Sequence, residues 1–175
     1  MGETFESGQA VMTRRVKQTS AVDGIAGEIG MANPIDLPER EVFLNLARTY
    51  SVLSDQVHAL IKQHGLSAPQ YNALRILRGH GKPVSIYQIG EQMVTRQPDM
   101  PRLIERLEKQ GFASRERCET DRRVVWVSLT KKGKSVLKQI DAPLDELHRD
   151  QLQHLSEKQM KTLSQLLVKA RRPEG

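Results

Sequence analysis

Polar and cationic side chains gather in two short segments of this chain, and their chemistry points to an anionic partner. The first segment runs from Gln97 to Lys109 and contains Gln97, Asp99, Arg102, Arg106 and Lys109. The second holds four arginines, two of them directly after a carboxylate: Arg115, Arg117, Asp121, Arg122 and Arg123. A guanidinium or amide group can form paired hydrogen bonds to the edge of a purine, and arginine also binds phosphate. These residue types therefore predict contacts with double-stranded nucleic acid.

A helix must position the first segment. Pro98 suits a first helical position, Asp99 favours a helix N-terminus, and Gly111 ends a helix predicted over residues 98–110. Before it, the capping box Ser85-x-x-Gln88 predicts a short helix. A short helix, a tight turn and a second helix form a helix-turn-helix, whose second helix reads base edges in the major groove. We expect Arg102 and Gln97 to contact bases, and Arg106 and Lys109 to contact phosphates.

A β-hairpin must position the second segment. Residues 112–117 and 123–129 are predicted as its strands, because the second of them is rich in β-branched and aromatic residues. The polar residues 118–122 form the turn. An arginine on such an exposed wing can enter a narrow minor groove, and Asp121 is expected to orient one arginine through a paired hydrogen bond. Arg115 and Arg117 lie on the incoming strand.

Helices are predicted for most of the remaining chain. Asp36-x-x-Glu39 approximates a capping box, and apolar residues then recur every three or four positions up to Gly65. Further caps at Ser67, Thr130 and Ser156 open three more helices, and Pro143 should kink the helix that begins after Thr130. Lys82-Pro83-Val84 is short and extended. The expected fold is mainly α with a small antiparallel β-hairpin wing.

Composition excludes several classes of protein. The 27 Lys and Arg residues outnumber the 21 Asp and Glu residues, but residues 91–123 hold eight basic and seven acidic side chains. An electrostatic argument must therefore rest on placement. A single cysteine, no apolar run of bilayer length and no signal pattern lead us to expect a cytoplasmic protein without membrane contact. The absence of nucleotide-binding, nucleophile-elbow and metal-ligand motifs predicts no enzyme activity, no cofactor and no metal.

Two stretches together resemble the MarR family signature: Leu103 to Phe112, and Asp121 to Gly133. They follow the pattern RLxxxG…DRRxxxVxLTxxG, and a looser resemblance extends from about residue 38 to 172. The resemblance implies a winged helix-turn-helix protein that forms a homodimer through its first and last helices. It also implies that a small molecule or a redox signal alters DNA affinity. Pro101 departs from the usual recognition helix, and we expect it to remove one helical hydrogen bond.

On this basis the chain is divided into four parts. Residues 1–35 form a flexible extension, in which residues 11–17 could be a short helix or a basic arm. Residues 36–66 form the first dimerisation helix, residues 67–130 the DNA-binding lobe, and residues 131–172 the C-terminal dimerisation helices.

The predicted function is a ligand- or stress-responsive repressor that binds a pseudo-palindromic operator as a homodimer. The alternative is a winged-helix protein-interaction module that does not bind DNA. A small aromatic or phenolic effector would lie near the polar candidates of the expected ligand site, which are Tyr50, His58, Tyr71 and Arg75. Cys118, next to Arg117, is interpreted as an incidental exposed residue, with a redox-sensitive wing as the alternative.

Overall fold

The computed structural model describes residues 24–172 and divides into two units, one up to Thr49 and one from Tyr50 onward. The proposed arm at residues 11–17 and most of the proposed extension lie outside the described residues. Within the first unit, residues 24–35 include a short helix, α1 (Ile25–Glu28), which the sequence did not predict. Ile25 and Ala26 of this helix are buried. The Glu28 carboxylate lies 3.9 Å from the Arg48 Nε.

Helix α2 (Pro38–Gln63) crosses from the first unit into the second. Pro38 is its first residue, and Asp36 is not its N-cap. Leu37 directly precedes the helix, and its carbonyl accepts hydrogen bonds from the backbone N–H groups of Arg40 and Glu41. The Asp36 carboxylate instead accepts a 3.5 Å hydrogen bond from the Arg40 side chain. The predicted capping box at Asp36 is therefore wrong, because the residue that precedes the helix is Leu37.

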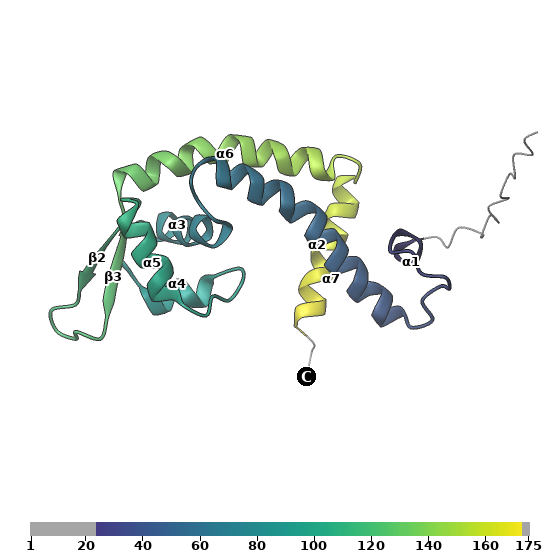
Figure 1. Ribbon diagram of the computed structural model, residues 1–175, viewed down its shortest axis with the longest axis horizontal. Coiled ribbons are helices and arrows are strands. Elements are labelled where there is room, and N and C mark those ends of the chain that lie inside the picture. Colours follow the sequence, from purple (N-terminus) through teal and green to yellow (C-terminus); the bar gives the residue numbers. More distant parts are fainter. Residues whose placement is uncertain (1–23, 173–175) are drawn as a thin grey trace, which may run out of the picture. The chain divides into compact units, whose positions relative to one another are not determined.

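The second unit continues with a series of helices and strands (Figure 1). They are α3 (Ala68–His80), β1 (Val84–Ser85), α4 (Ile86–Gln92), α5 (Met100–Lys109), β2 (Ala113–Arg117), β3 (Val125–Leu129), α6 (Lys131–Leu152) and α7 (Glu157–Arg171). Complete capping boxes open α3, α4 and α7, at Ser67, Ser85 and Ser156. Each cap was predicted from a serine followed three residues later by glutamine.

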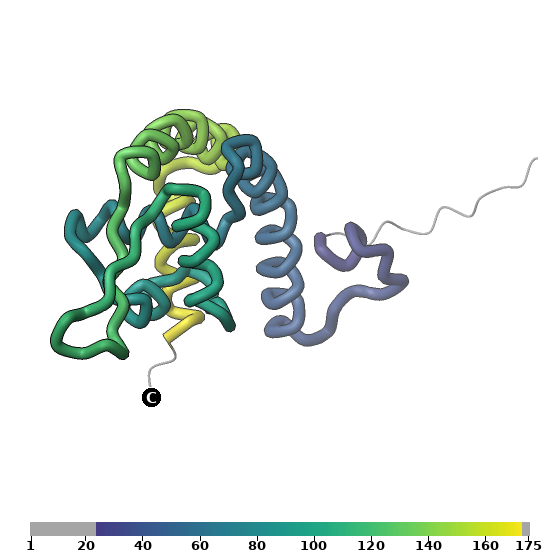
Figure 2. The backbone as a smooth tube through the Cα atoms, turned by 60° about the vertical axis from the view of Figure 1, so that its left-hand side comes forward, coloured from purple at the N-terminus to yellow at the C-terminus, as the bar shows by residue number. Residues whose placement is uncertain are grey.

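The sheet contains the predicted hairpin and one further strand. Strands β2 and β3 pair antiparallel, with Arg117 opposite Val125 and Ala113 opposite Leu129. Strand β1 pairs with the other edge of β3, so the strand order is β1-β3-β2. Val84 and Val127 face each other across this second pairing and are both buried. The turn between β2 and β3 projects away from the helices (Figures 1 and 2).

The apolar faces of α3, α4, α5 and α6 meet the sheet in one core. Its largest fully buried side chains are Ile61, Leu74, Leu77, Val84, Ile89, Ile104, Leu107, Val127, Leu137 and Ile140. Outside this core, a paired ion contact joins α3 to α6, where the Arg78 guanidinium donates to Asp141 at 2.6 and 2.9 Å. Pro143 lies inside α6 and does not end it. No helix within residues 24–172 combines the length and apolar character that a bilayer crossing needs.

Candidate nucleic-acid interface and pocket

Helix α5 begins at Met100, later than predicted. Asp99 is its N-cap, and the carboxylate accepts a 3.0 Å hydrogen bond from the Arg102 N–H. Pro98 therefore lies outside the helix, and Pro101 occupies the first turn. The first N–H groups of a helix have no partner within the helix, so proline at this position removes no helical hydrogen bond. The predicted loss at Pro101 was wrong for this reason.

One face of α5 is buried and the opposite face is exposed. Met100, Leu103, Ile104 and Leu107 contribute the buried face. Arg102, Arg106 and Lys109 are exposed. Within residues 24–172, the ion pairs of α5 join Lys109 to Glu105 at 2.6 Å and Glu108 to Arg115 of strand β2. Arg102 and Arg106 are thus the exposed cations of the helix that carry no ion pair.

Acidic residues near α5 are neutralised by specific partners. The Arg115 Nε donates a 2.8 Å hydrogen bond to Glu108, and this contact lowers the pKa of the Glu108 carboxyl. The hydrogen bond from Lys109 likewise lowers the pKa of Glu105. Asp99 serves as a helix cap. This placement leaves a net positive face on α5, although residues 91–123 hold almost equal numbers of acidic and basic side chains.

Gln97 does not lie on the recognition helix. It belongs to the turn between α4 and α5, where its side-chain amide donates to the carbonyls of Thr95 and Arg96 at 3.1 and 3.2 Å. The turn covers residues 93–99 and is longer than the predicted tight turn. Arg96, which the sequence analysis did not select, is exposed within this turn. Its position two residues before the predicted helix was the signal available in the sequence.

The turn of the hairpin and the end of strand β2 carry exposed arginines. Arg117, Arg122 and Arg123 are all exposed. Asp121 orders this turn by accepting a 2.9 Å hydrogen bond from the backbone N–H of Arg123. Its carbonyl also accepts from the N–H of Val124. We had expected Asp121 to hold an arginine side chain, but within residues 24–172 no ion pair joins it to Arg122 or Arg123.

Cys118 begins the same turn and is partly exposed. Its Sγ lies 3.2 Å from the Thr120 hydroxyl. Hydrogen bonding by Thr120, supported by backbone groups of residues 120 and 121, lowers the pKa of the Cys118 thiol to about 7. The thiol is therefore more acidic than an ordinary cysteine, for which a pKa of about 8.5 is typical.

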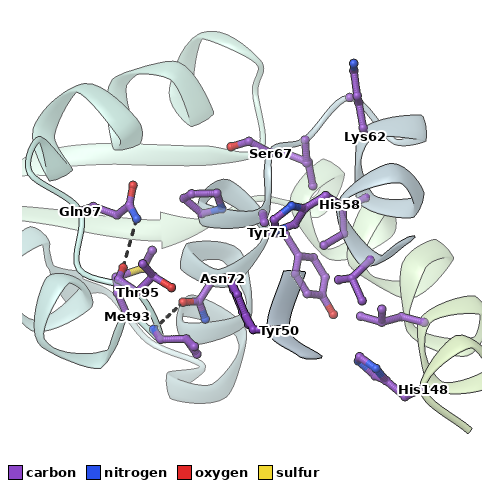
Figure 3. A pocket seen from close by; sticks show the side chains of 18 residues that line it. Tyr50, His58, Lys62, Ser67, Tyr71, Asn72, Met93, Thr95, Gln97 and His148 are labelled. Carbon is purple, nitrogen blue, oxygen red and sulfur yellow. Dashed lines mark hydrogen bonds between the residues drawn. The ribbon is translucent and has the colours of Figure 1, made fainter. Parts of the chain in front are cut away.

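A pocket of about 980 Å³ lies in the second unit, between the C-terminal part of α2, α3, the α4–α5 turn and α6 (Figure 3). Three of the four predicted ligand-site residues line it: Tyr50, His58 and Tyr71. The fourth, Arg75, is not among the lining residues. Its Nη1 instead donates a 3.0 Å hydrogen bond to the Tyr71 hydroxyl. His148 of α6 adds a further polar group that the sequence did not suggest.

The α4–α5 turn forms one wall of this pocket, through Met93, Val94, Thr95 and Gln97. Asn72 of α3 holds the turn, because its side-chain oxygen accepts a 2.8 Å hydrogen bond from the Val94 N–H (Figure 3). A molecule in the pocket would therefore touch the segment that leads directly into α5. Within residues 24–172, no cluster of three His, Cys, Asp or Glu side chains is arranged to hold a metal ion.

Comparison with known proteins identifies the family. A crystal structure of a MarR transcription factor from Planctomyces limnophilus is 36% identical to this chain. The similarity covers 77% of this chain and 98% of that one, with a TM-score of 0.61. This chain belongs to the MarR family.

Further comparisons agree with membership of the MarR family. The MarR family model matches residues 66–125. The HTH-type transcriptional regulator MhqR of Bacillus subtilis is 27% identical over 131 residues, which cover 73% of this chain and 87% of that protein. The organohalide-sensing regulator RdhR-CbdbA1625, solved with 2,4-dichlorophenol bound, shares the fold with a TM-score of 0.72. It is 16% identical to this chain, covering 79% of this chain and 85% of that one.

The MarR signature of this chain has a structural reason. Thr130 caps α6 by accepting from the Gly133 N–H, and its hydroxyl donates to the carbonyls of Gly111 and Phe112 at 2.8 and 3.0 Å. The threonine and the two glycines of the pattern thus join the end of the recognition helix, the wing and the last long helix. This chain is a MarR transcriptional regulator with a winged helix-turn-helix fold.

Proposed function

We propose that this MarR protein is a homodimeric repressor that binds a pseudo-palindromic DNA operator and releases it when a small aromatic molecule binds. The observation that carries the DNA-binding part is the exposed face of α5, where Arg102 and Arg106 have no ion pair. The hairpin that follows α5 adds exposed arginines on its turn. Exposed arginines on two separate elements, the helix α5 and the hairpin turn, suit a duplex with two grooves. The hairpin also carries the exposed carboxylates of Glu116, Glu119 and Asp121, so its contribution rests on individual arginines and not on net charge.

Each cationic residue has a proposed role. Arg102, in the first turn of α5, reads a guanine edge in the major groove, and Arg106 contacts phosphate. Arg122 and Arg123 contact the minor groove and its phosphates. Arg115 and Lys109 contribute less, because Glu108 and Glu105 already neutralise them. Gln97 contributes indirectly, by holding the α4–α5 turn in shape, because its side-chain amide is already hydrogen-bonded within that turn.

The experiment uses DNA sequences selected from a random pool by the purified protein. Binding of the selected duplex is followed by fluorescence anisotropy over a range of salt concentrations. Each phosphate contact contributes about 0.9 to the slope of log affinity against log salt, and the double variant Arg122→Ala/Arg123→Ala removes four arginines from a dimer, so the magnitude of the slope should fall by about 3.6. The matched control Arg149→Ala removes an exposed arginine of α6 and should leave the slope unchanged.

The same experiment distinguishes DNA binding from the alternative function, a protein-interaction module. A winged-helix module that binds protein and not DNA would select no sequence from the pool, and any residual DNA binding would not depend on Arg102. Loss of selection in Arg102→Ala, together with retained binding by Arg149→Ala, supports sequence-specific recognition. Equal binding by all variants would contradict the proposal.

The homodimer is proposed from apolar side chains exposed on helices of the single chain. On α7, Leu163, Leu166 and Val168 are 43%, 59% and 42% exposed. On α2, Phe43 and Tyr50 are 68% and 64% exposed. Apolar surface of this extent on an isolated helix favours a partner surface. A second copy of the chain is the proposed partner, with residues 36–66 and 131–172 as the dimerisation segments and residues 67–130 as the DNA-binding lobe.

Light scattering tests the dimer. Leu166→Glu places a carboxylate on the exposed apolar face of α7, and we expect it to shift the protein to monomer at micromolar concentration. Gln165→Glu, on the next position of the same helix, is exposed in the single chain and is the charge-matched control. A wild-type protein that is monomeric at every concentration would exclude this part of the proposal.

The ligand class follows from the hydrogen bonds of Tyr71. Its hydroxyl oxygen already accepts from Arg75, so the hydroxyl hydrogen is free to donate into the pocket. In Figure 3 the ring of Tyr71 lies among the pocket side chains, with its hydroxyl on the side of His148. An aromatic ring bearing a phenolate or carboxylate would fit apolar walls and one such donor. The phenol-bound relative of the same fold agrees with this class of ligand.

Calorimetry with 2,4-dichlorophenol as the probe tests the ligand class. Tyr71→Phe should weaken binding by roughly threefold to tenfold, the equivalent of one hydrogen bond. Tyr87→Phe is the matched control, because Tyr87 is 75% exposed and does not line the pocket. Equal binding by wild type and Tyr71→Phe would remove Tyr71 from the ligand site.

A further inference from the structure

Two glutamine side chains connect the C-terminal end of the recognition helix to the end of α2. Gln110 is the C-cap of α5. Its side-chain Nε2 donates to the carbonyl of Gly65 at 3.2 Å, and its Oε1 accepts from the Nε2 of Gln70 at 2.9 Å. Gly65 follows the last residue of α2 closely, and Gln70 lies in the first turn of α3. We call this chain of contacts the glutamine relay.

The orientation of every amide in the relay is determined by its neighbours. The Oε1 of Gln70 accepts a 2.9 Å hydrogen bond from the Ser67 N–H, so its Nε2 must face Gln110. The Oε1 of Gln110 must then face Gln70, which directs its Nε2 to the Gly65 carbonyl. Each side-chain nitrogen of the relay thus faces an acceptor oxygen, and each side-chain oxygen faces a donor N–H group.

The Gln70 amide is the buried part of the relay, whereas Gln110 and Gly65 are exposed. Gln70 is 9% exposed. Its amide is satisfied only while its partners keep their positions, because water cannot replace them easily. The relay joins residues that are 40 and 45 positions apart in sequence. It therefore acts as a long-range constraint on α5 and not as a local cap alone.

The backbone around Gln110 is held from a third direction. The Lys132 Nζ of α6 donates a 2.7 Å hydrogen bond to the Gln110 carbonyl and lies 4.9 Å from the centre of the Phe112 ring. Gly111, with φ of 77°, reverses the chain at this point. The C-terminal end of α5 is thus anchored to the end of α2 and to the starts of α3 and α6.

A small tilt about this anchored end would move the other end of α5 by a distance that matters for DNA. The ten residues of α5 span about 15 Å at 1.5 Å per residue, so a tilt of about 10° displaces the first turn by about 2.6 Å. Successive bases along a strand are about 3.4 Å apart. Arg102 lies in that first turn. Loss of the anchor would therefore allow the Arg102 side chain to vary in position along the DNA by a distance close to the spacing of neighbouring bases.

We propose that the glutamine relay sets the position of α5 relative to the end of α2, and thereby determines which spacing of the two operator half-sites the dimer accepts. Gln110 and Gln70 are positioning residues in this proposal. Neither needs to touch DNA. The inference rests on the proposed dimeric DNA binding, since only a dimer compares the spacing of two half-sites.

The test measures spacing discrimination and not affinity alone. Wild type, Gln110→Ala and Gln110→Glu are titrated with the selected operator and with versions in which the half-sites are one base pair closer or further apart. Gln63→Ala is the matched control, because Gln63 is an exposed glutamine at the end of α2. We expect wild type and Gln63→Ala to lose at least tenfold in affinity when the spacing changes.

Gln110→Ala should lose less than threefold between spacings, while binding the best operator several-fold more weakly than wild type does. Gln110→Glu keeps an acceptor for Gln70 but cannot donate to Gly65, and should behave like Gln110→Ala. A uniform drop in affinity at every spacing would indicate a general structural role and would overturn the inference.

A second readout does not require DNA. A spin label at position 106, introduced as Arg106→Cys in a Cys118→Ser background, reports the distance between the two α5 helices of a dimer. We expect Gln110→Ala to broaden the distance distribution, and an unchanged width would overturn the inference even where the protein binds no operator. A protein without any interspin distance would be monomeric, which would refute the proposed dimer and the inference with it.

Discussion

Gly133 offers a sharp test of how the wing is joined to α6. It lies in the first turn of α6, is buried, and its N–H donates to the Thr130 hydroxyl at 3.0 Å. A Cβ added at this position would overlap the Phe112 carbonyl oxygen and would come 2.6 Å from the Leu129 Cδ1. Ordinary carbon contacts are about 3.5–4.0 Å. The leucine side chain can rotate, but the carbonyl is part of the backbone.

The Phe112 carbonyl cannot move freely, because it accepts hydrogen bonds from both the N–H and the hydroxyl of Thr130. Gly133→Ala should therefore shift the backbone at the base of β2, at a cost of about 1–3 kcal/mol in the free energy of unfolding. For a chain of this size that corresponds to a fall in Tm of roughly 3–10 °C. Helix propensity alone predicts the opposite sign, a gain of about 1 kcal/mol.

Thermal and urea unfolding of Gly133→Ala decide between the two effects. Gly79→Ala is the matched control, because Gly79 lies within α3 and no atom comes within 4 Å of an added Cβ. We expect this control to gain up to about 1 kcal/mol. A Gly133→Ala protein as stable as wild type, or more stable, would refute the reasoning.

Three further predictions concern a side-chain pair, a thiol and a helix cap. The Arg78 hydrogen bond lowers the pKa of Asp141, so the stability from this half-exposed pair is present above the ordinary aspartate pKa and is lost as pH falls below about 4. Urea unfolding of Asp141→Asn at neutral pH should show a loss of about 1 kcal/mol or less, and an unchanged acid dependence would contradict the argument. The rate of Cys118 alkylation by iodoacetamide should rise with a midpoint near pH 7, and Thr120→Ala should move that midpoint upward; a midpoint near 8.5 in wild type would contradict it. Ser85→Ala removes the N-cap of α4 and should lower the unfolding free energy by about 1 kcal/mol, as measured by urea titration, whereas no change would show that the cap is replaced by water.

The sequence determined features whose interactions lie within one helical turn or one strand pairing. Ser67, Ser85 and Ser156 each cap a helix together with a glutamine three residues later. Gly111 ends α5, and the β-branched and aromatic run within residues 123–129 marks the second strand of the hairpin. These features could be predicted because the partners are a few residues apart, so the spacing of residue types already fixes the contact.

The errors in the predicted starts of α5 and α2 arose because neighbouring residues each carry a helix-start signal. Pro98, Asp99 and Pro101 each suit a helix start, and the residue types alone do not say which of them begins α5. The hydrogen bond from the Arg102 N–H to the Asp99 carboxylate decides it. In the same way, Asp36 lost its expected capping role because the helix begins at Pro38.

Only the tertiary structure decided which polar groups remain free and which are held. The packing of β2 against α5 joins Arg115 to Glu108 and leaves Arg102 and Arg106 without an ion pair. It also brings Gln110 within hydrogen-bond distance of Gly65, 45 residues away. The physical reason is that such contacts depend on how whole elements pack, and residue spacing along the chain carries no measure of that distance.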